Sequence, residues 1–406
     1  MKLKLRLLCL VLAVCFALSA CGTQTTIEST APATQATTQA ATEATTQVLP
    51  VWPARESMVE NPAGIRNIIL IIGDGMGLGQ LQAGQLYDGK AYDFTNWQRV
   101  SVNTASATYT GEISPNPTDS AASATAMATG TLTVNGYVGM LPDGTELTTI
   151  FDVANAMGKA TGIVTTDSLL GATPSGFSAH TRSRSADKLL FSTQLQSGVN
   201  LLCGSTDSAC TSNVQDIQDN GYAYCQNYAE LAGTFASQKA YWQLPLAGVD
   251  AEVNLADVSV DALNYLSQDS DGFVLMIEQA HIDKYCHDHK FLGATQSVSN
   301  LNATVEAVMA WLGDRTDTVV LITADHETGG LQVSDQAEYP NEEAVTVGGE
   351  SKSLYYIFNA GAHTSANVAL FVHGVTVDFA KSELYKDEAL KNTGIFYLML
   401  DILGQH

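Results

Sequence analysis

The sequence predicts an α/β fold, a three-layer sandwich built around a central, mostly parallel sheet. Short apolar runs alternate with stretches of helical periodicity, which is the order that such a sandwich requires. The runs are apolar almost throughout, as expected of strands that are buried on both faces. Acids, histidines and glycines stand beside several of these runs, where open α/β sheets bind their ligands.

The expected strands share a high content of Val, Ile, Leu and Thr: Asn67–Ile72, Thr161–Thr165, Gly272–Ile277, Thr318–Thr323 and Val368–Val372. The expected helices carry either many alanines or apolar residues at helical spacing: Ser120–Thr129, Leu147–Met157, Asp257–Leu266 and Ser297–Leu312. Residues 190–255 have a weaker pattern. We expect a partly irregular region there, in part an inserted cap or a peripheral subregion.

Composition restricts the function. The chain has 406 residues, 45% of them hydrophobic, which is enough for a packed core and excludes a wholly disordered protein. Its formal charge of −23 repels nucleic acid phosphates, so we expect no nucleic-acid binding. An anionic substrate would need strong local positive charge. Since only 19 residues are Lys or Arg, metal ions would have to supply most of it.

The N-terminus predicts export. Basic residues precede an apolar run from Leu7 to Ala20, which is short for a membrane span and suits a signal peptide over residues 1–20. Cys21 follows in a lipobox-like context and is the expected lipidation site. A plain secretory signal with an incidental cysteine is the alternative. Residues 21–52, rich in Thr, Ala and Gln, form the expected flexible tether, and residues 53–406 the catalytic domain.

Four cysteines lie beyond the lipobox. Outside the cytoplasm they could form two disulfides, with three possible pairings. Proximity favours a bond between Cys203 and Cys210, with Cys225 and Cys286 left; Cys286 stands beside a candidate metal ligand and could instead be free.

Metal-binding residue types recur beside the predicted strands. One cluster alone could be a helix cap or a structural histidine, but this does not explain why they recur at strand after strand. Oxygen and imidazole ligands without thiolates suit zinc, and an all-oxygen site suits magnesium. The candidates are Asp74 after the first strand, Glu278, Asp283 and His287 after the third, Asp325 and His326 after the fourth, and His363 just before the fifth.

Ser120 is the candidate nucleophile. Thr118 or Asp119 can cap the alanine-rich helix, which puts Ser120 in its first turn, where free N–H groups favour an anion. Taken alone, Ser120 could be merely a capping residue, and no G-x-S-x-G motif supports an esterase triad. Arg184 is the candidate phosphate clamp, although spacing does not distinguish it from Arg182.

These residues resemble the alkaline phosphatase family. The matching segments occur in the family's order over about residues 65 to 375: IILIIGDGMG, TDSAASATAMATG, ATPSGFSAHTRSR, FVLMIEQAHIDKYCH, LITADHETGG and GAHT. The resemblance implies an α/β sandwich and a phosphomonoesterase with two zinc ions and one magnesium ion. Two ions can stabilise the attacking and leaving oxygens of a phosphoryl transfer.

The resemblance also implies roles for single residues. Ser120 would be transiently phosphorylated, while Arg184 and Lys284 would contact phosphate. One zinc would bind Asp283, His287 and His363. The other would bind Asp74, Asp325, His326 and the Ser120 oxygen. Magnesium would bind Asp74, Thr173 and Glu278.

One position departs from the family pattern. Many members have Asp or His where this chain has Gly171. We therefore expect Lys284 to be freer to reach phosphate and the magnesium site to be weaker.

Substrate and setting follow from the same resemblance. Phosphate monoesters are the expected substrates, phosphate scavenging on the extracytoplasmic side of a membrane is the expected purpose, and a homodimer is allowed but not required. Two alternatives stay open. One is a phosphodiesterase of the same superfamily, and the other is a lipid-anchored, non-catalytic metal-binding protein.

Overall fold

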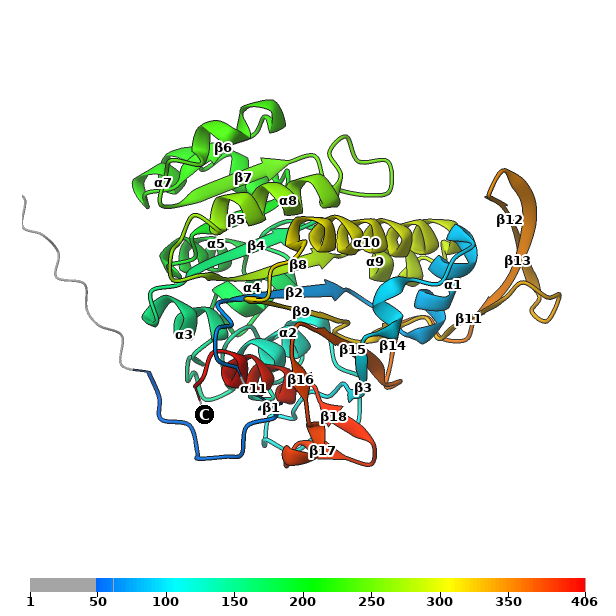
Figure 1. The fold of residues 1–406 in the computed structure, drawn as a ribbon, viewed down its shortest axis with the longest axis horizontal. Coiled ribbons are helices and arrows are strands. Elements are labelled where there is room, and N and C mark those ends of the chain that lie inside the picture. Colours follow the sequence, from blue (N-terminus) through cyan, green and yellow to red (C-terminus); the bar gives the residue numbers. More distant parts are fainter. Residues whose placement is uncertain (1–48, 61, 406) are drawn as a thin grey trace, which may run out of the picture. The chain divides into compact units, whose positions relative to one another are not determined.

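The computed structural model describes residues 49–60 and 62–405, and an eleven-stranded sheet runs through its centre (Figure 1). The predicted signal peptide and Cys21 lie outside the described residues. In spatial order the strands are β17 (Tyr385–Lys386), β18 (Ala389–Lys391), β3 (Gln98–Asn103), β15 (Val368–His373), β9 (Thr318–Thr323), β2 (Asn67–Gly73), β8 (Phe273–Gln279), β4 (Ala160–Thr165), β5 (Leu201–Ser205), β7 (Ala240–Leu244) and β6 (Ala223–Cys225).

The centre of the sheet is parallel and buried on both faces. Strand β2 lies between β8 and β9 and runs parallel to both, with Ile72 in register with Glu278 and with Thr323. All seven residues of β2 are buried, which explains why the strand is one continuous apolar run. Because these parallel strands end together, the residues that follow them meet at one edge of the sheet.

The five expected strands are present, but one runs in an unexpected direction. Val368–Val372 lies within β15, which pairs antiparallel with both β3 and β9. We expected a buried parallel strand there. Burial between two neighbouring strands gives the same apolar run in either direction, so the sequence pattern carries no information on polarity.

Residues 190–255 are more regular than the sequence indicated. They contribute β5, β7 and β6, which extend the central sheet at one edge by parallel pairing. They do not form a separate cap over the sheet. Helix α5 (Asp187–Gln196) leads into β5. Helices α6 (Ser208–Thr211) and α7 (Val214–Asp219) connect β5 to β6, and the 3₁₀ helix η2 (Tyr228–Thr234) connects β6 to β7.

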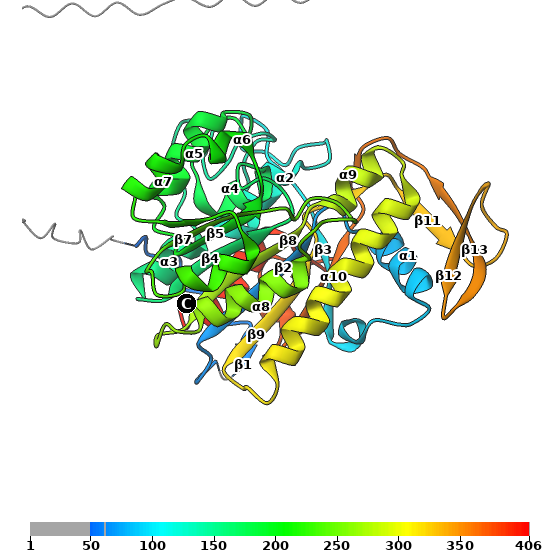
Figure 2. The same cartoon turned by 90° about the horizontal axis from the view of Figure 1, so that it is seen from above.

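Helices cover both faces of the sheet, which confirms the three-layer prediction (Figure 2). One face carries α8 (Leu255–Leu266) and α10 (Phe291–Leu312), with α1 (Leu78–Asp88) packed against α10. The other carries α2 (Ser120–Thr129), α3 (Ile150–Ala156), α4 (Ala172–Ser178) and α11 (Thr393–Ile402). Helix α3 begins later than predicted because Thr149 and Asp152 form a capping box at its start. The remaining helices are α9 (His281–His287), η1 (Asp93–Asn96) and η3 (Phe379–Lys381).

Three smaller strand groups complete the fold. The three-stranded sheet of β11 (Leu331–Ser334), β13 (Glu350–Phe358) and β12 (Asn341–Val347) lies beside α1 at one end of the body (Figures 1 and 2). Strand β1 (Val59–Glu60) pairs with β16 (Thr376–Val377). Strand β10 (Glu327–Thr328) pairs antiparallel with β14 (His363–Thr364) and carries candidate site residues on both strands.

No disulfide joins the four described cysteines, all of which are buried and free. The expected Cys203–Cys210 bond is therefore absent. Cys203 lies within β5, whereas Cys210 lies in α6 with its sulfur 3.1 Å from the Tyr241 hydroxyl. Among the described residues, we find no helix with both the length and the apolar content needed to cross a membrane.

Candidate active site

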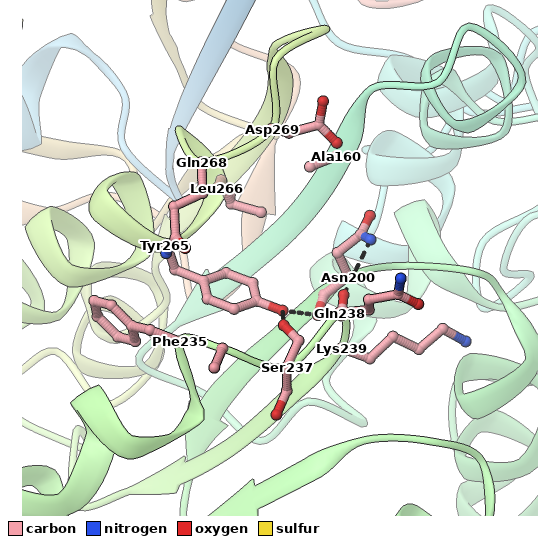
Figure 3. A pocket seen from close by; sticks show the side chains of 11 residues that line it. Ala160, Asn200, Phe235, Ser237, Gln238, Lys239, Tyr265, Leu266, Gln268 and Asp269 are labelled. Carbon is pink, nitrogen blue, oxygen red and sulfur yellow. Dashed lines mark hydrogen bonds between the residues drawn. The ribbon is translucent and has the colours of Figure 1, made fainter.

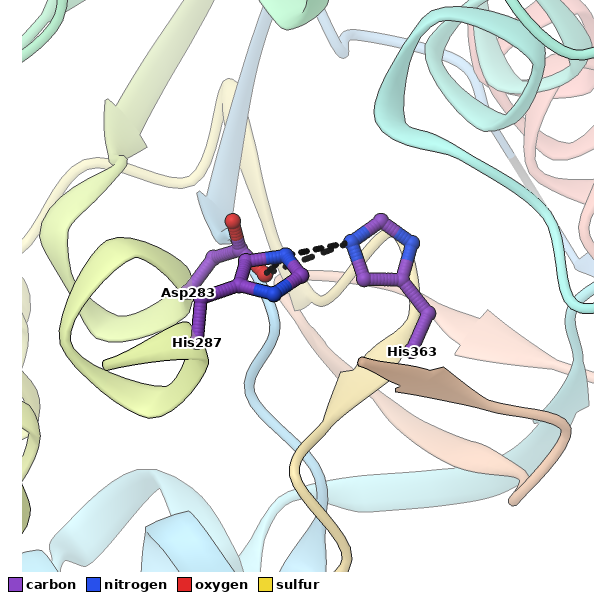
Figure 4. Close-up of side chains that lie close together, drawn as sticks. All are labelled: Asp283, His287 and His363. Carbon is purple, nitrogen blue, oxygen red and sulfur yellow. Dashed lines mark hydrogen bonds and ion pairs between the residues drawn. The ribbon is translucent and has the colours of Figure 1, made fainter. Parts of the chain in front are cut away.

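The first cluster of candidate ligands joins α9 to β14. Asp283 and His287 lie one helical turn apart on α9, and His363 approaches from β14 (Figure 4). The Nε2 atoms of His287 and His363 are 3.0 Å apart, and they lie 3.4 and 3.5 Å from Asp283 Oδ1. The Nδ1 atom of His363 lies 2.8 Å from the Thr118 carbonyl, to which it must donate, so its Nε2 lone pair faces the cluster. We call Asp283, His287 and His363 the first triad.

A second cluster lies at the carboxyl ends of β2 and β9. His326 Nε2 is 3.2 Å from Asp325 Oδ2 and 3.6 Å from Asp74 Oδ1, and all three residues are buried. We call Asp74, Asp325 and His326 the second triad. In each triad, one ligand atom from every residue lies within 4.8 Å of the others. The structure thus brings these six side chains together in two groups of three.

Gly75 lets the two triads approach each other. Its backbone has a φ of 74°, which L side chains rarely adopt, and an added Cβ would lie 2.8 Å from the Asp283 Cα. Its N–H donates to Asp325 Oδ1 over 3.0 Å. A residue without a side chain is thus required between Asp74 and the helix that carries Asp283.

Ser120 is the first residue of α2, and its hydroxyl faces the second triad. The Oγ atom lies 3.2 Å from His326 Nε2, and the residue is only 3% exposed. Asp119, not Thr118, caps the helix, since its Oδ1 accepts the Ala122 N–H over 2.9 Å. The hydroxyl therefore lies at the positive end of a helix and next to metal-type ligands.

Arg184, rather than Arg182, lies at this helix start. Its Nη1 is 3.2 Å from Asp119 Oδ2, and the same oxygen accepts the Gly136 N–H over 2.9 Å. Arg182 instead comes close to Gly144. Of the two arginines that spacing could not distinguish, Arg184 is therefore the one beside the start of α2.

Glu278 lies near the second triad, since its charge acts on Asp74, and Thr173 lies near Glu278. Glu278 is in register with Ile72 across β2 and with Thr165 across β4, and its carboxylate accepts a hydrogen bond from the Thr165 hydroxyl. Thr173 lies in the first turn of α4; it is 1% exposed, and its Oγ1 has no hydrogen-bond partner.

Lys284, which we expected to be freer to reach phosphate, has a charged partner in the structure. Its ammonium group pairs with Asp167 Oδ1. A Cβ at Gly171 would lie 2.8 Å from Asp167 Oδ2, so the Asp167 carboxylate fills the space beside Gly171. The Asp167 carboxylate, which comes from just beyond β4, therefore takes the space that a side chain at position 171 would fill. The same carboxylate is the partner of Lys284.

Burial and crowding of like charges dominate the electrostatics. Burial raises the pKa of Asp74, and the charge of Asp325 raises it further. Burial, followed by the charge of Asp167, raises the pKa of Glu278 to about 8. Burial lowers the pKa of His326 to about 3, so this imidazole is neutral and able to act as a ligand. A cation would relieve the repulsion among these carboxylates.

The donor atoms fit divalent cations. Asp74 Oδ1, Asp325 Oδ2 and Thr173 Oγ1 are buried and make no hydrogen bond, although buried polar atoms nearly always find a partner. The two triads offer nitrogen and oxygen ligands of the kind zinc prefers, and Thr173 and Glu278 add oxygens of the kind magnesium prefers.

Comparison with known proteins now identifies the family. The family model described as alkaline phosphatase matches residues 65–200 and 206–389. The chain belongs to the alkaline phosphatase family. It is 29% identical over 312 residues to alkaline phosphatase 3 of Bacillus subtilis, covering 72% of this chain and 67% of that protein. It is 28% identical over 358 residues to alkaline phosphatase of Escherichia coli, covering 70% and 74%. The chain thus spans about two thirds to three quarters of these curated relatives.

Solved structures agree on the fold. The alkaline phosphatase of Thermus thermophilus superimposes with a TM-score of 0.72 at 19% identity, covering 89% of this chain and 96% of that one. The enzyme from the Antarctic bacterium TAB5 gives 0.70 at 21% identity, covering 84% and 98%. Family and fold together support a metal-dependent phosphatase.

Another hollow of the alkaline phosphatase fold lies far from this chemistry. A pocket of about 420 Å³ opens near Ala160, the first residue of β4, so it lies toward the opposite ends of the parallel strands from the triads (Figure 3). Two of its polar groups already have partners: the Tyr265 hydroxyl donates to the Ser237 carbonyl over 2.8 Å, and the Asn200 amide donates to the Gln238 carbonyl. We assign it no ligand.

Sequence reasoning missed two polar residues of this site. Asp167 stands two residues beyond the end of β4 and could have been found by the rule that led to Asp74, because it too lies just past a parallel strand. Thr328 contacts both triads, but threonine two residues after a histidine carries no recognisable pattern.

Proposed function

We propose that this protein is an alkaline phosphatase that hydrolyses phosphate monoesters through a phosphoserine at Ser120. One observation carries the proposal: the Ser120 hydroxyl, at the start of a helix, lies 3.2 Å from an imidazole nitrogen of a buried ligand triad. An isolated serine is a weak nucleophile and needs an activating neighbour. Arg184, which pairs with Asp119 next to Ser120, would supply positive charge for the phosphate.

The proposed ions fall into two kinds. The first triad would hold one zinc, the second triad another, and Asp74, Thr173 and Glu278 a magnesium. Bound there, the three ions would supply the positive charge that a phosphoryl group requires and polarise the serine hydroxyl. With a formal charge of −23, the chain itself lacks that positive charge.

The chain's own residues would act in sequence. The Ser120 oxygen attacks phosphorus in line with the ester oxygen and gives up its proton to solvent. The P–O bond to the alcohol breaks, and the leaving oxygen takes a proton from solvent and departs as the alcohol. Water then attacks the phosphoserine, which releases phosphate and restores the hydroxyl. Arg184, which is partly exposed and held by Asp119, would bind two phosphoryl oxygens. The free N–H groups at the start of α2 would also attract the negatively charged phosphoryl oxygens.

Lys284 has a more restricted role in this proposal. Because it pairs with Asp167, it would reach phosphate only through water or after that ion pair breaks. Its charge would still contribute to attraction of the substrate.

We further propose that the enzyme acts outside the cytoplasm. Residues 1–20 would direct export, lipidated Cys21 would anchor the chain to a membrane, and residues 21–52 would hold the catalytic domain away from it. Phosphate scavenging is the purpose that this location suggests. Analytical ultracentrifugation of the purified protein would determine whether it forms a homodimer.

The test combines metal analysis with two substrates. The protein should contain zinc and magnesium and should hydrolyse p-nitrophenyl phosphate much faster than bis(p-nitrophenyl) phosphate. Ser120→Ala should abolish turnover and keep the metals, whereas Ser192→Ala, at an exposed position of α5, should change neither. Faster cleavage of the diester would favour a phosphodiesterase. Bound zinc without turnover of any ester would favour the non-catalytic metal-binding protein.

A further inference from the structure

Thr328 contacts both triads through one hydroxyl group. Its Oγ1 lies 2.5 Å from Asp283 Oδ1, in the first triad, and 3.2 Å from His326 Nδ1, in the second. The residue is fully buried at the end of β10. A single hydroxyl thus forms a direct path between the two groups of proposed ligands.

The chemistry of the three groups fixes the direction of the hydrogen bonds. An ionised carboxylate can only accept, so the Thr328 hydroxyl must donate its one proton to Asp283. Toward His326 the same oxygen must then accept, so Nδ1 carries the imidazole proton. The lone pair of His326 is left on Nε2, which faces Asp74 and Asp325. This is the tautomer that can bind a metal in the second triad.

The backbone around Thr328 holds the hydroxyl in place. Its N–H donates to the Gly75 carbonyl over 3.2 Å, and its carbonyl accepts the Gln80 side-chain amide over 2.6 Å. Antiparallel pairing sets Thr328 directly opposite His363 of the first triad. The rings of His363 and His326 also stack, with centroids 3.5 Å apart. Thr328 therefore has little freedom to turn away from either triad.

We propose that Thr328 is a positioning residue that couples the two metal sites. A cation in the first triad orders the Asp283 carboxylate, which orders the Thr328 proton, which in turn keeps His326 in its metal-binding tautomer. By linkage, a cation in the second triad favours binding in the first by the same factor. The inference rests on the proposed metal centre, but not on the identity of the substrate.

Two substitutions separate the hydroxyl from the shape of the side chain. Thr328→Val keeps the volume and removes the hydroxyl, whereas Thr328→Ser keeps the hydroxyl. Thr295→Val is the matched control, because Thr295 is also buried and its hydroxyl has no hydrogen-bond partner. Loss of a group that hydrogen-bonds to a metal ligand typically lowers metal affinity by about 10–100-fold.

The first measurement is a zinc titration of the metal-free protein against a chromophoric chelator. Thr328→Val should weaken both sites by about 10–100-fold and abolish cooperativity between them. Thr328→Ser and Thr295→Val should bind zinc like the wild type. Weakening of one site alone, or of neither, would overturn the coupling.

The second measurement uses ¹⁵N NMR of the histidine rings in the metal-free protein. His326 should carry its proton on Nδ1 in the wild type and should lose this preference in Thr328→Val. A wild-type His326 protonated on Nε2 would refute the proposed direction of the bonds. A protein that passes both measurements but hydrolyses no monoester would refute the proposed function and leave the coupling intact. A protein that hydrolyses monoesters but shows no coupling between the two sites would refute the coupling and leave the proposed function intact.

Discussion

Asp119 holds Arg184 beside the start of α2, with Oδ2 and Nη1 3.2 Å apart. The same carboxylate caps the helix through Ala122 and accepts the Gly136 N–H. One side chain therefore stabilises the helix that presents Ser120, anchors the following loop and orients the arginine proposed to bind phosphate.

Two substitutions at Asp119 should differ in stability. Asp119→Ala removes the cap, the loop contact and the ion pair, and should lower the free energy of unfolding by about 0.5–2 kcal/mol, as loss of an N-cap usually does. Asp119→Asn keeps an oxygen for Ala122 but presents an amide to Gly136 and Arg184, so it should fall between wild type and alanine. Urea denaturation measures both. Equal stability of the three proteins would show that the cap is unimportant.

Because the pKa of Glu278 is raised, we expect the metal-free protein to lose stability as pH rises from about 6.5 to 8. Burial and the charge of Asp167 raise the pKa of Glu278 from its usual 4.5 to about 8. The folded protein thus retains a proton that the unfolded chain has lost, and stability falls with pH in this range. His326, with a pKa lowered from 6.5 to about 3, has the opposite effect, but only below about pH 6.5.

Thermal unfolding of the chelator-treated protein at several pH values tests this prediction. Glu278→Gln should flatten the pH dependence above 6.5, while Glu338→Gln, at an exposed position, should leave it unchanged. Added zinc and magnesium should raise the melting temperature, since ligands that bind only the folded state stabilise it. A metal-free wild type with constant stability from pH 6.5 to 8 would contradict the argument.

The sequence was sufficient for elements whose pattern is local. Strand β9 has the predicted bounds, and α2 begins at Ser120 as expected, because a buried run and a capped, alanine-rich helix are defined by their own residues. The direction of β15 was not predictable, because it depends on which strands flank it. Strands β5 and β7 were overlooked because LLCGS and AYWQL are short and interrupted by glycine or glutamine.

The same distinction holds for the site. Asp74 and Asp325 could be placed together in advance, because both stand within two residues of the end of a parallel strand. The contact between Thr328 and Asp283 joins residues 45 positions apart, through a loop whose path no local pattern specifies. The ion pair of Lys284 with Asp167 arises in the same way, across 117 positions.

The space between positions 171 and 167 should hold the Asp167 side chain but not a second side chain at position 171. In Gly171→Asp, the new Cβ would meet Asp167 Oδ2 at 2.8 Å and the Ser168 carbonyl at 2.9 Å. Overpacking of this kind typically costs about 1–3 kcal/mol. The substitution adds a second carboxylate to a crowded site, so it should also change magnesium affinity. The double variant Asp167→Ala/Gly171→Asp should recover part of the lost stability.

Magnesium titration of the four proteins of this cycle measures the interaction directly. If the two carboxylates compete for one position, the effects of the single substitutions should not add. Additive effects, or an unchanged magnesium affinity in Gly171→Asp, would show that position 171 is independent of the metal shell.

Arg55 and Asp401 should determine how far the chain can be shortened from its N-terminus. Arg55 Nη1 lies 2.6 Å from Asp401 Oδ1, and the other carboxylate oxygen accepts the Met58 N–H over 2.8 Å. Asp401 is fully buried in α11, so removal of Arg55 leaves an uncompensated buried charge.

Arg55→Ala should therefore destabilise the protein by up to about 3–5 kcal/mol. Arg55→Met with Asp401→Asn should restore much of that loss, because no buried charge remains. A protein that starts at Leu49 keeps both the ion pair and the packing of Trp52 against Phe396, so it should melt like the longer chain. One that starts at Ser57 loses both and should melt no higher than Arg55→Ala. Equal melting temperatures for all of them would show that this ion pair does not fasten the N-terminal segment.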